Sequence, residues 1–151
     1  MTGRLLGIAR HKRPKAPMET VDHAHVGLDT GIAGDFRGAI RPGKSGRRQV
    51  TMHALADWNH ALALVGTPVS WEQRRANLLV DGIDLPREKG ARIRIGGTLT
   101  LEITGECDPC RRMEDLARGL ELALKPEWRG GRTMRVVIAG DIRVGDIVTL
   151  V

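Results

Sequence analysis

The sequence has 151 residues, a length that suits one domain of ordinary size. Hydrophobic residues make up 41% and charged residues 28% of the chain, which excludes a wholly disordered protein. The net charge is +6 at pH 7, but the cations do not gather into a block, and only three Trp and one Phe are available to stack on bases. These features weigh against nucleic-acid and membrane partners. They favour either a solvated basic surface or a small phosphate-bearing ligand.

The compartment is predicted from the N-terminus and the cysteines. No apolar run approaches the roughly 20 residues that span a bilayer. The first four residues have no hydrophobic signal region behind them, and two cysteines three residues apart are too few and too close for a secreted disulfide scaffold. We therefore expect a cytoplasmic protein.

The first half of the chain mixes short strands with one helix. Residues 4–9 (RLLGIA) predict a first strand, and residues 11–17 (HKRPKAP) form a basic loop that prolines interrupt. Residues 27–46 carry six glycines and few apolar residues, so we expect a long irregular segment of the kind that is often functional. Apolar residues at helical spacing predict a helix over 54–65. The other expected elements are a strand over 49–52, a helical turn over 72–75 and a strand over 76–80.

The second half has a clearer pattern. Residues 92–95 and 98–104 alternate polar and apolar side chains on either side of Gly96-Gly97, a strong signal for a hairpin turn. An apolar stripe predicts an amphipathic helix over 112–124. Two further β segments are expected, over 133–138 and 142–151.

Two segments of the chain have similar sequences, residues 94–101 (RIGGTLTL) and residues 143–150 (RVGDIVTL). Both segments have the pattern of a strand, a Gly turn and a strand, so we expect two similar hairpins in one sheet. Short strands between Gly turns, with only two or three helices, indicate a mainly β fold, either a β-barrel or a strongly curved sheet. We expect a single domain over residues 1–151.

The sharpest feature is the segment Cys107-Asp108-Pro109-Cys110, which follows a predicted strand and opens a predicted helix. Backbone N–H groups at the start of a helix have no intrahelical partner, and they favour negative charge. The neighbouring Arg111 and Arg112 add positive charge. Both effects favour the thiolate, which is the form that attacks electrophiles and binds metals.

Four interpretations of the cysteine pair are open at this point. The thiols can be buried structural residues. A structural zinc site needs two more Cys or His ligands at matching spacing, and His23 and His25 lie in a different loop. A thioredoxin-like dithiol agrees with C-x-P-C between a strand and a helix, but that fold needs βαβ units that this chain does not show. The fourth interpretation is a cysteine that ligates a metal cofactor or carries sulfur.

Candidate binding residues also lie outside this segment. Arg47 and Arg48, beside Lys44, can hold a phosphate because guanidinium groups form bidentate contacts with oxyanions, or they can line a solvated strand edge. Asn77 has both donor and acceptor groups, which suits either the polar edge of a ligand or the orientation of a loop.

Two further expectations concern the Gly-rich segment and the histidines. Asp35 and Arg37 are expected to form an ion pair at the mouth of a pocket. His25 is expected to be a satisfied loop histidine, and His53 is expected to cap or pack the helix that follows it.

Several blocks, in the expected order, resemble the MOSC domain, the module named after the C-terminus of molybdenum-cofactor sulfurases. They extend over nearly the whole chain: GIAGD (31–35), RRQVT (47–51), RANLLVDGIDL (75–85), GARIRIG (90–96), LEIT (101–104), the Cys-x-Pro-Cys segment, and RGGR (129–132) before IRVGD (142–146). The family fold is a β-rich barrel, which agrees with the fold predicted from the pattern.

The resemblance implies a chemistry for the cysteines. In the family, one cysteine carries sulfur or ligates molybdenum in the pterin cofactor, and a Pro-Cys pair marks it; that pattern falls on Cys110, and a thiolate is a soft ligand that suits molybdenum. Cys107 is then a resolving thiol or a bystander, and the opposite assignment stays open. The expected site has Cys110 and Cys107 as catalytic thiols, with Cys110 as the metal ligand. The expected cofactor-binding residues are Lys44, Arg47, Arg48, Asn77 and Arg111.

The resemblance also implies a function. A short stand-alone member binds molybdenum cofactor (molybdopterin) or carries sulfur, and its partners are a pterin or small-molecule ligand and an electron-donor or sulfur-donor protein. If the chain is an enzyme, it is a molybdenum-dependent oxidoreductase or a sulfur-transfer protein. Pyridoxal phosphate belongs to the aminotransferase-like domain of the sulfurases, and no Schiff-base lysine site is evident here. The alternatives are a thiol–disulfide redox protein that uses Cys107 and Cys110, and a non-catalytic anion-binding module.

Overall fold

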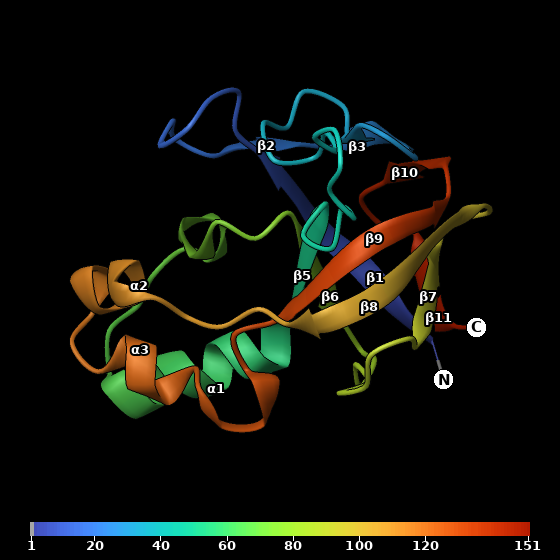
Figure 1. Ribbon diagram of the computed structural model, residues 1–151. Coiled ribbons are helices and arrows are strands. Elements are labelled where there is room, and N and C mark those ends of the chain that lie inside the picture. The colour runs from blue at the N-terminus through green and yellow to red at the C-terminus, as the bar shows by residue number, and fades with distance from the viewer. Residues whose placement is uncertain (1) are drawn as a thin grey trace.

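Seven strands close into a barrel in the computed structural model, which describes residues 2–151 (Figure 1). The strands follow the order β11-β7-β8-β9-β5-β6-β1, and the barrel closes because β11 also pairs with β1. Their bounds are β1 (Thr2–Arg10), β5 (Val50–Ala54), β6 (Leu78–Asp81), β7 (Arg92–Ile95), β8 (Leu99–Glu106), β9 (Arg132–Ile138) and β11 (Ile147–Leu150). The expected β-barrel is therefore confirmed.

Smaller elements flank the barrel. Strand β2 (Glu19–Val21) pairs with the end of β1, and a second sheet has the order β10-β3-β4, from Gly140–Arg143, His23–Gly27 and Gly31–Ile32. The helices α1 (Leu55–Val65), α2 (Arg111–Leu116) and α3 (Leu120–Ala123) lie together on one side of the barrel (Figure 1). Two 3₁₀ turns complete the fold, η1 (Trp71–Arg74) and η2 (Pro126–Trp128).

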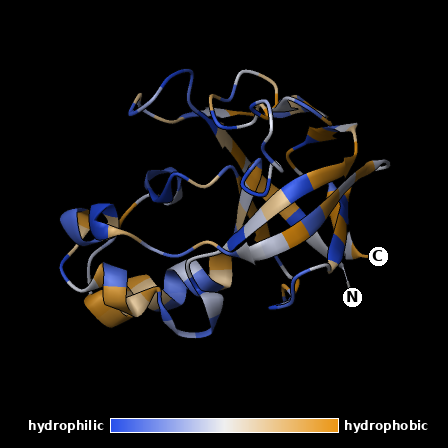
Figure 2. Cartoon of the chain, viewed as in Figure 1, coloured by the Kyte–Doolittle hydropathy of each residue, from blue (hydrophilic) through white to orange (hydrophobic). Residues whose placement is uncertain are grey.

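Alternating side chains explain why the barrel strands form. In β7, Ile93 and Ile95 point into the core while Arg92 and Arg94 are exposed. The same alternation places Leu99, Leu101 and Ile103 of β8 inside. Apolar and polar residues alternate along these strands in Figure 2. A period of two is the pattern of a strand with one buried face, so the sequence encodes these strands locally.

The predicted helix over 112–124 is wrong in one respect, because the structure divides it into α2 and α3. Ala117 is extended, and Gly119 has a φ of +88°, which interrupts the helical backbone. The carboxylate of Glu114 accepts hydrogen bonds from the backbone N–H groups of Gly119 and Glu121. Glu114 thus satisfies donors at the start of α3 that a continuous helix would have used internally.

The expectation of two similar hairpins in one sheet is half wrong. β7 and β8 form the predicted hairpin, but β10 pairs with β3 in the second sheet, whereas β11 pairs with β1 and β7. The turn between β10 and β11 bonds to other segments: Val144 N–H donates to Asp22 O, and Gly145 N–H donates to Leu5 O. These bonds hold the turn against Asp22 and β1. As a result β10 and β11 do not pair with each other, and β11 pairs with β1 to close the barrel.

Candidate functional site

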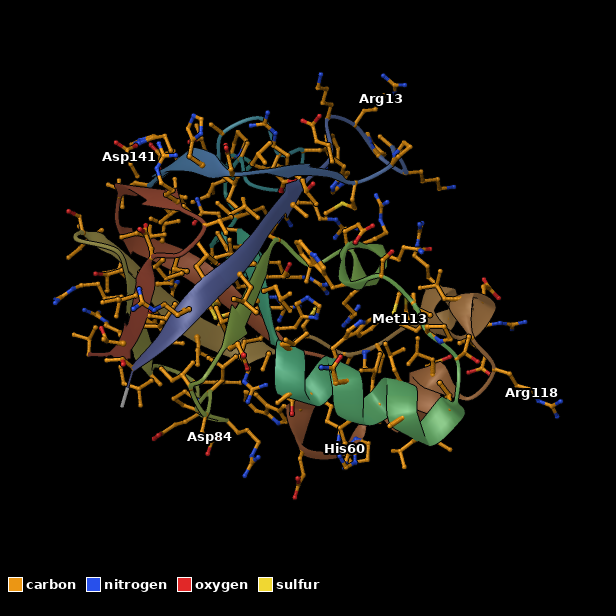
Figure 3. The ribbon with its side chains drawn as sticks, turned by 180° about the vertical axis from the view of Figure 1, so that it is seen from behind. Arg13, His60, Asp84, Met113, Arg118 and Asp141 are labelled. Atoms are coloured by element: carbon orange, nitrogen blue, oxygen red, sulfur yellow. The ribbon has the colours of Figure 1, made fainter. Side chains whose placement is uncertain are left out.

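The two cysteines open onto a cleft of about 490 Å³ between the barrel and the helices, which we call the cysteine cleft. The loop that carries Arg13, and helix α2, which carries Met113, lie on the same side of the molecule in Figure 3, and both contribute side chains to the cleft. Besides Cys107 and Cys110, the lining includes the cations Lys15, Arg37, Arg48, Arg74, Arg75 and Arg112.

The cleft is strongly cationic. Its lining has six Lys and Arg side chains against two carboxylates, those of Asp35 and Asp108. Across residues 2–151, none of these six cations lies within 4 Å of a carboxylate oxygen. Guanidinium groups that lack a carboxylate partner bind oxyanions well, so the cleft suits an anionic ligand.

Cys107 is buried, with 5% of its surface exposed, and lies next to two arginines. Its Sγ is 3.6 Å from Nη2 of Arg74 and 4.0 Å from Nη2 of Arg48. Arg74 also donates hydrogen bonds to the carbonyl oxygens of Cys107 and Gly130. A Cβ at Gly130 would lie 2.5 Å from the oxygen of Cys107, so only glycine permits this close approach.

Cys110 is exposed at the edge of the same cleft. It has an extended backbone immediately before α2, and its carbonyl oxygen accepts a hydrogen bond from Met113 N–H. The Cys-x-Pro-Cys segment therefore presents one enclosed sulfur beside cations and one accessible sulfur at the rim.

Asn77 and Arg48 line the cleft together with the cysteines, as the sequence suggested. The amide of Asn77 is occupied by protein partners: Oδ1 accepts hydrogen bonds from the backbone N–H and the hydroxyl of Thr51, and Nδ2 donates to Ala9 O. Asn77 thus connects β5 to the end of β1, and its contacts are those of a residue that fixes the cleft wall.

Lys44 and Arg47 line an adjacent pocket of about 420 Å³, which shares Arg37 and Arg48 with the cysteine cleft. The structure therefore brings these cations next to the cleft. Arg111 lines neither pocket; its exposed side chain forms an ion pair with Asp115 at 3.5 Å.

The expected ion pair between Asp35 and Arg37 is not formed among the described residues. The carboxylate of Asp35 instead lies 3.4 Å from Nδ1 of His11, a residue that sequence analysis did not select. The pairing requires the end of β1 and the Gly-rich segment to meet, which no local pattern reveals. Both residues are buried at the cleft wall.

Sequence analysis also did not select Arg74, and it did not reveal how burial and neighbouring charges change the pKa values of His11 and His53. Burial lowers the pKa of His11, and Asp35 opposes this effect while Arg75, Arg37 and Arg112 reinforce it. Burial, with a smaller effect of Arg74, lowers the pKa of His53 to about 3.

The two histidine predictions agree with the structure. The ring of His53 packs against Trp58 of the following helix and against Trp71, as expected. His25 is satisfied by Asp141, with a distance of 2.7 Å from Nδ1 to the carboxylate, although it lies in strand β3 and not in a loop.

Among residues 2–151, no three His, Cys, Asp or Glu side chains are grouped so that they could hold a metal ion. None of the helices in this part of the chain has the length and apolar character that a bilayer crossing requires.

Comparisons with known proteins identify the family. No curated protein matches the chain. Among solved structures, the YuaD protein from Bacillus subtilis is 22% identical, with a TM-score of 0.82, over 98% of this chain and 94% of that one. YiiM from Escherichia coli is 15% identical (TM-score 0.68; 98% and 69% covered), and YiiM from Geobacillus stearothermophilus is 15% identical (TM-score 0.67; 99% and 73% covered). These likenesses show a shared fold. The family model of the MOSC domain matches residues 38–149, most of the sequence, so the chain belongs to the MOSC domain family.

Proposed function

We propose that this protein binds molybdenum cofactor in the cysteine cleft, with Cys110 as the thiolate ligand of the metal. One observation supports the proposal: both cysteines and six cations line the same cleft. A volume of about 490 Å³ falls within the range of small-molecule sites, roughly 300–1,000 Å³. The cofactor combines a phosphate with sulfur-bound molybdenum, and the cleft offers cations for the first and thiols for the second.

A second observation supports the fit between these residues and the cofactor. Nδ1 of His11 and Oδ2 of Asp35 are buried at the cleft wall and have no hydrogen-bond partner among the described residues. Buried polar atoms are nearly always satisfied in folded proteins, so this unsatisfied pair distinguishes the cleft wall from ordinary packing and supports a polar binding site there.

Each group of residues has a proposed task. Cys110, at the accessible rim, supplies the soft ligand, while Arg74 and Arg48 surround Cys107 and keep negative charge favourable at that end. Arg48, Arg47 and Lys44 hold the phosphate. When bound, the cofactor supplies two-electron chemistry at molybdenum. An electron-donor or sulfur-donor protein is the partner that this chemistry requires, and the cytoplasm is the expected compartment.

The test is the metal and pterin content of protein purified from a host that makes the cofactor. We expect molybdenum, by mass spectrometry, and pterin, by fluorescence after oxidation, in nearly equal amounts. Cys110→Ser should abolish molybdenum loading, and the matched variant Cys107→Ser should keep most of it. Wild-type protein without molybdenum or pterin would overturn the proposal. Loss of loading in Cys107→Ser alone would reassign the ligand to Cys107.

A further inference from the structure

A buried histidine–aspartate pair lines the cysteine cleft, and neither residue is among those proposed to hold the metal or the phosphate. His11 is 5% exposed and Asp35 is 8% exposed. The backbone fixes their relation, because His11 N–H donates to Oδ1 of Asp35 at 3.1 Å and Phe36 N–H donates to His11 O at 2.7 Å. These bonds fix the backbone of His11 against the segment that carries Asp35, and the ring is buried at the cleft wall.

The ring atoms of His11 have different surroundings. Nδ1 faces Asp35 at 3.4 Å but makes no hydrogen bond, and it is fully buried. Nε2 makes no hydrogen bond to residues 2–151 either, yet it is not among the fully buried unpartnered atoms. Because His11 lines the cleft, Nε2 is the ring atom that can reach a ligand there.

Three arginines complete the surroundings of His11. Arg37 lies in the segment that carries Asp35, Arg75 follows η1, and Arg112 belongs to α2. All three line the cleft together with His11, and their charge lowers the pKa of His11 further, after the larger effect of burial. Arg75 has a φ of +65°, a conformation that side-chain-bearing residues rarely adopt and that often marks functional sites. The whole lining, with six cations and two carboxylates, is strongly positive even when His11 is neutral, which suits a multiply charged anion.

We propose that His11, Arg37, Arg75 and Arg112 bind a dianionic oxyanion group of the phosphate type, and that His11 takes up a proton when this group binds. The bound anion places negative charge beside the imidazole and offsets the three arginines, so the imidazolium becomes favourable. Asp35, held against Nδ1, stabilises the same protonated form. The inference rests on the proposed function and deepens it. The oxyanion is either the phosphate of the cofactor, bound here and not at Lys44, Arg47 and Arg48, or the phosphate of a separate ligand.

Sulfate is the probe, since it keeps its charge through the range in which histidine titrates. Calorimetry at constant ionic strength should show binding that is about three- to tenfold tighter at about pH 6 than at about pH 8, because a pKa rise of one unit corresponds to about tenfold in affinity. Repeating the titration in buffers of different ionisation enthalpy should show proton uptake by the protein.

Variants distinguish the residues that bind the anion from the residue that takes up the proton. Arg75→Gln and Arg112→Gln should each weaken sulfate binding several-fold, while Arg92→Gln, on β7 and paired with Glu102, should leave it unchanged. His11→Gln should still bind sulfate but lose the pH dependence. If that variant does not fold, histidine NMR signals of the wild-type protein give the same answer, because sulfate should raise the pKa of His11.

Several results would overturn the inference: no sulfate binding by the wild-type protein, equal affinity at both pH values, or unchanged binding in Arg75→Gln. Protein loaded with cofactor separates the two sources of the oxyanion. Exclusion of sulfate from loaded protein assigns the site to the cofactor phosphate, and retained binding assigns it to a separate ligand. A chain that never takes up molybdenum can still bind sulfate at this site. The experiments therefore distinguish failure of the proposed function from failure of this inference.

Discussion

Arg74 is the residue that most directly connects the fold to the thiols. Its guanidinium is buried, with 7% of the residue exposed, and donates to Gly130 O and Cys107 O. No carboxylate among residues 2–151 lies within 4 Å of it, and the nearest group that can become an anion is the thiol of Cys107. Burying an unpaired guanidinium is costly, so its hydrogen bonds to the two carbonyl oxygens and its contact with the sulfur of Cys107 are what stabilise it.

Replacing Arg74 should therefore destabilise the protein. Arg74→Ala leaves the carbonyl oxygens of Gly130 and Cys107 without donors, and we expect the free energy of unfolding to fall by about 2–4 kcal/mol. Urea unfolding followed by circular dichroism measures this change. The control Arg111→Ala removes an exposed arginine that pairs only with Asp115, and it should change the free energy by less than about 0.5 kcal/mol. Equal losses in both variants would contradict the role given to Arg74.

The candidate site could be predicted only where its residues carry a local signal. The cysteine spacing, and Arg48 in a basic run, were sufficient to select residues that line the cleft. Arg74 and Arg75 are adjacent in the sequence, and nothing in the pattern distinguishes the one buried beside Cys107 from the other. Arg111 was selected for its position beside Cys110, but the direction of α2 turns it to solvent.

At the scale of elements, local periodicity predicted several barrel strands and α1 to within two residues, but it did not predict the short strands β2, β3 and β4. The expected strands over 4–9, 92–95 and 133–138 agree with β1, β7 and β9 to within two residues at each end. Their partners could not be predicted, because the closing pair of β1 and β11 joins the two ends of the chain. The helix over 112–124 was predicted from an apolar stripe that is buried as expected, but the stripe does not reveal the backbone break.

The break between α2 and α3 depends on Gly119. Its φ of +88° is strained for any residue with a side chain, so Gly119→Ala should lower the free energy of unfolding by about 1–2 kcal/mol. Space is not the cause, because a Cβ there would meet only Val65 at 3.5 Å. Gly97→Ala is the control, since Gly97 has open space and no such φ. Thermal unfolding of both variants measures the change in stability. If Gly119→Ala left the free energy of unfolding unchanged, the backbone would have relaxed to accommodate the side chain.

At the scale of the whole molecule, the described residues 2–151 form two apolar cores. One fills the barrel, and the other lies among the helices around Trp58, Met113 and Leu120. His53, on β5, lies where they approach each other: its ring centroid is 5.8 Å from that of Trp58 and 5.9 Å from that of Trp71. Its Nε2 is buried without a hydrogen-bond partner among the described residues, so the imidazole is packed there as a neutral ring.

This packing should make the protein sensitive to acid. The pKa of His53 is about 3 in the folded chain and near 6.5 in the unfolded one, so between these values the unfolded state binds more protons. The free energy of unfolding should therefore fall as the pH falls, by about 4 kcal/mol from this residue between pH 7 and pH 3.

The variant His53→Leu isolates this contribution, because leucine keeps an apolar side chain between the two tryptophans and cannot bind a proton. Urea unfolding from pH 7 to pH 4 should show a steeper loss of stability in the wild-type protein than in His53→Leu. The difference between the two curves removes the effects of Asp57 and Glu106, whose pKa values burial raises, because both proteins contain them. Parallel curves would mean that the folded protein admits a proton to His53 at ordinary pH, and that the contact between the two cores opens to water.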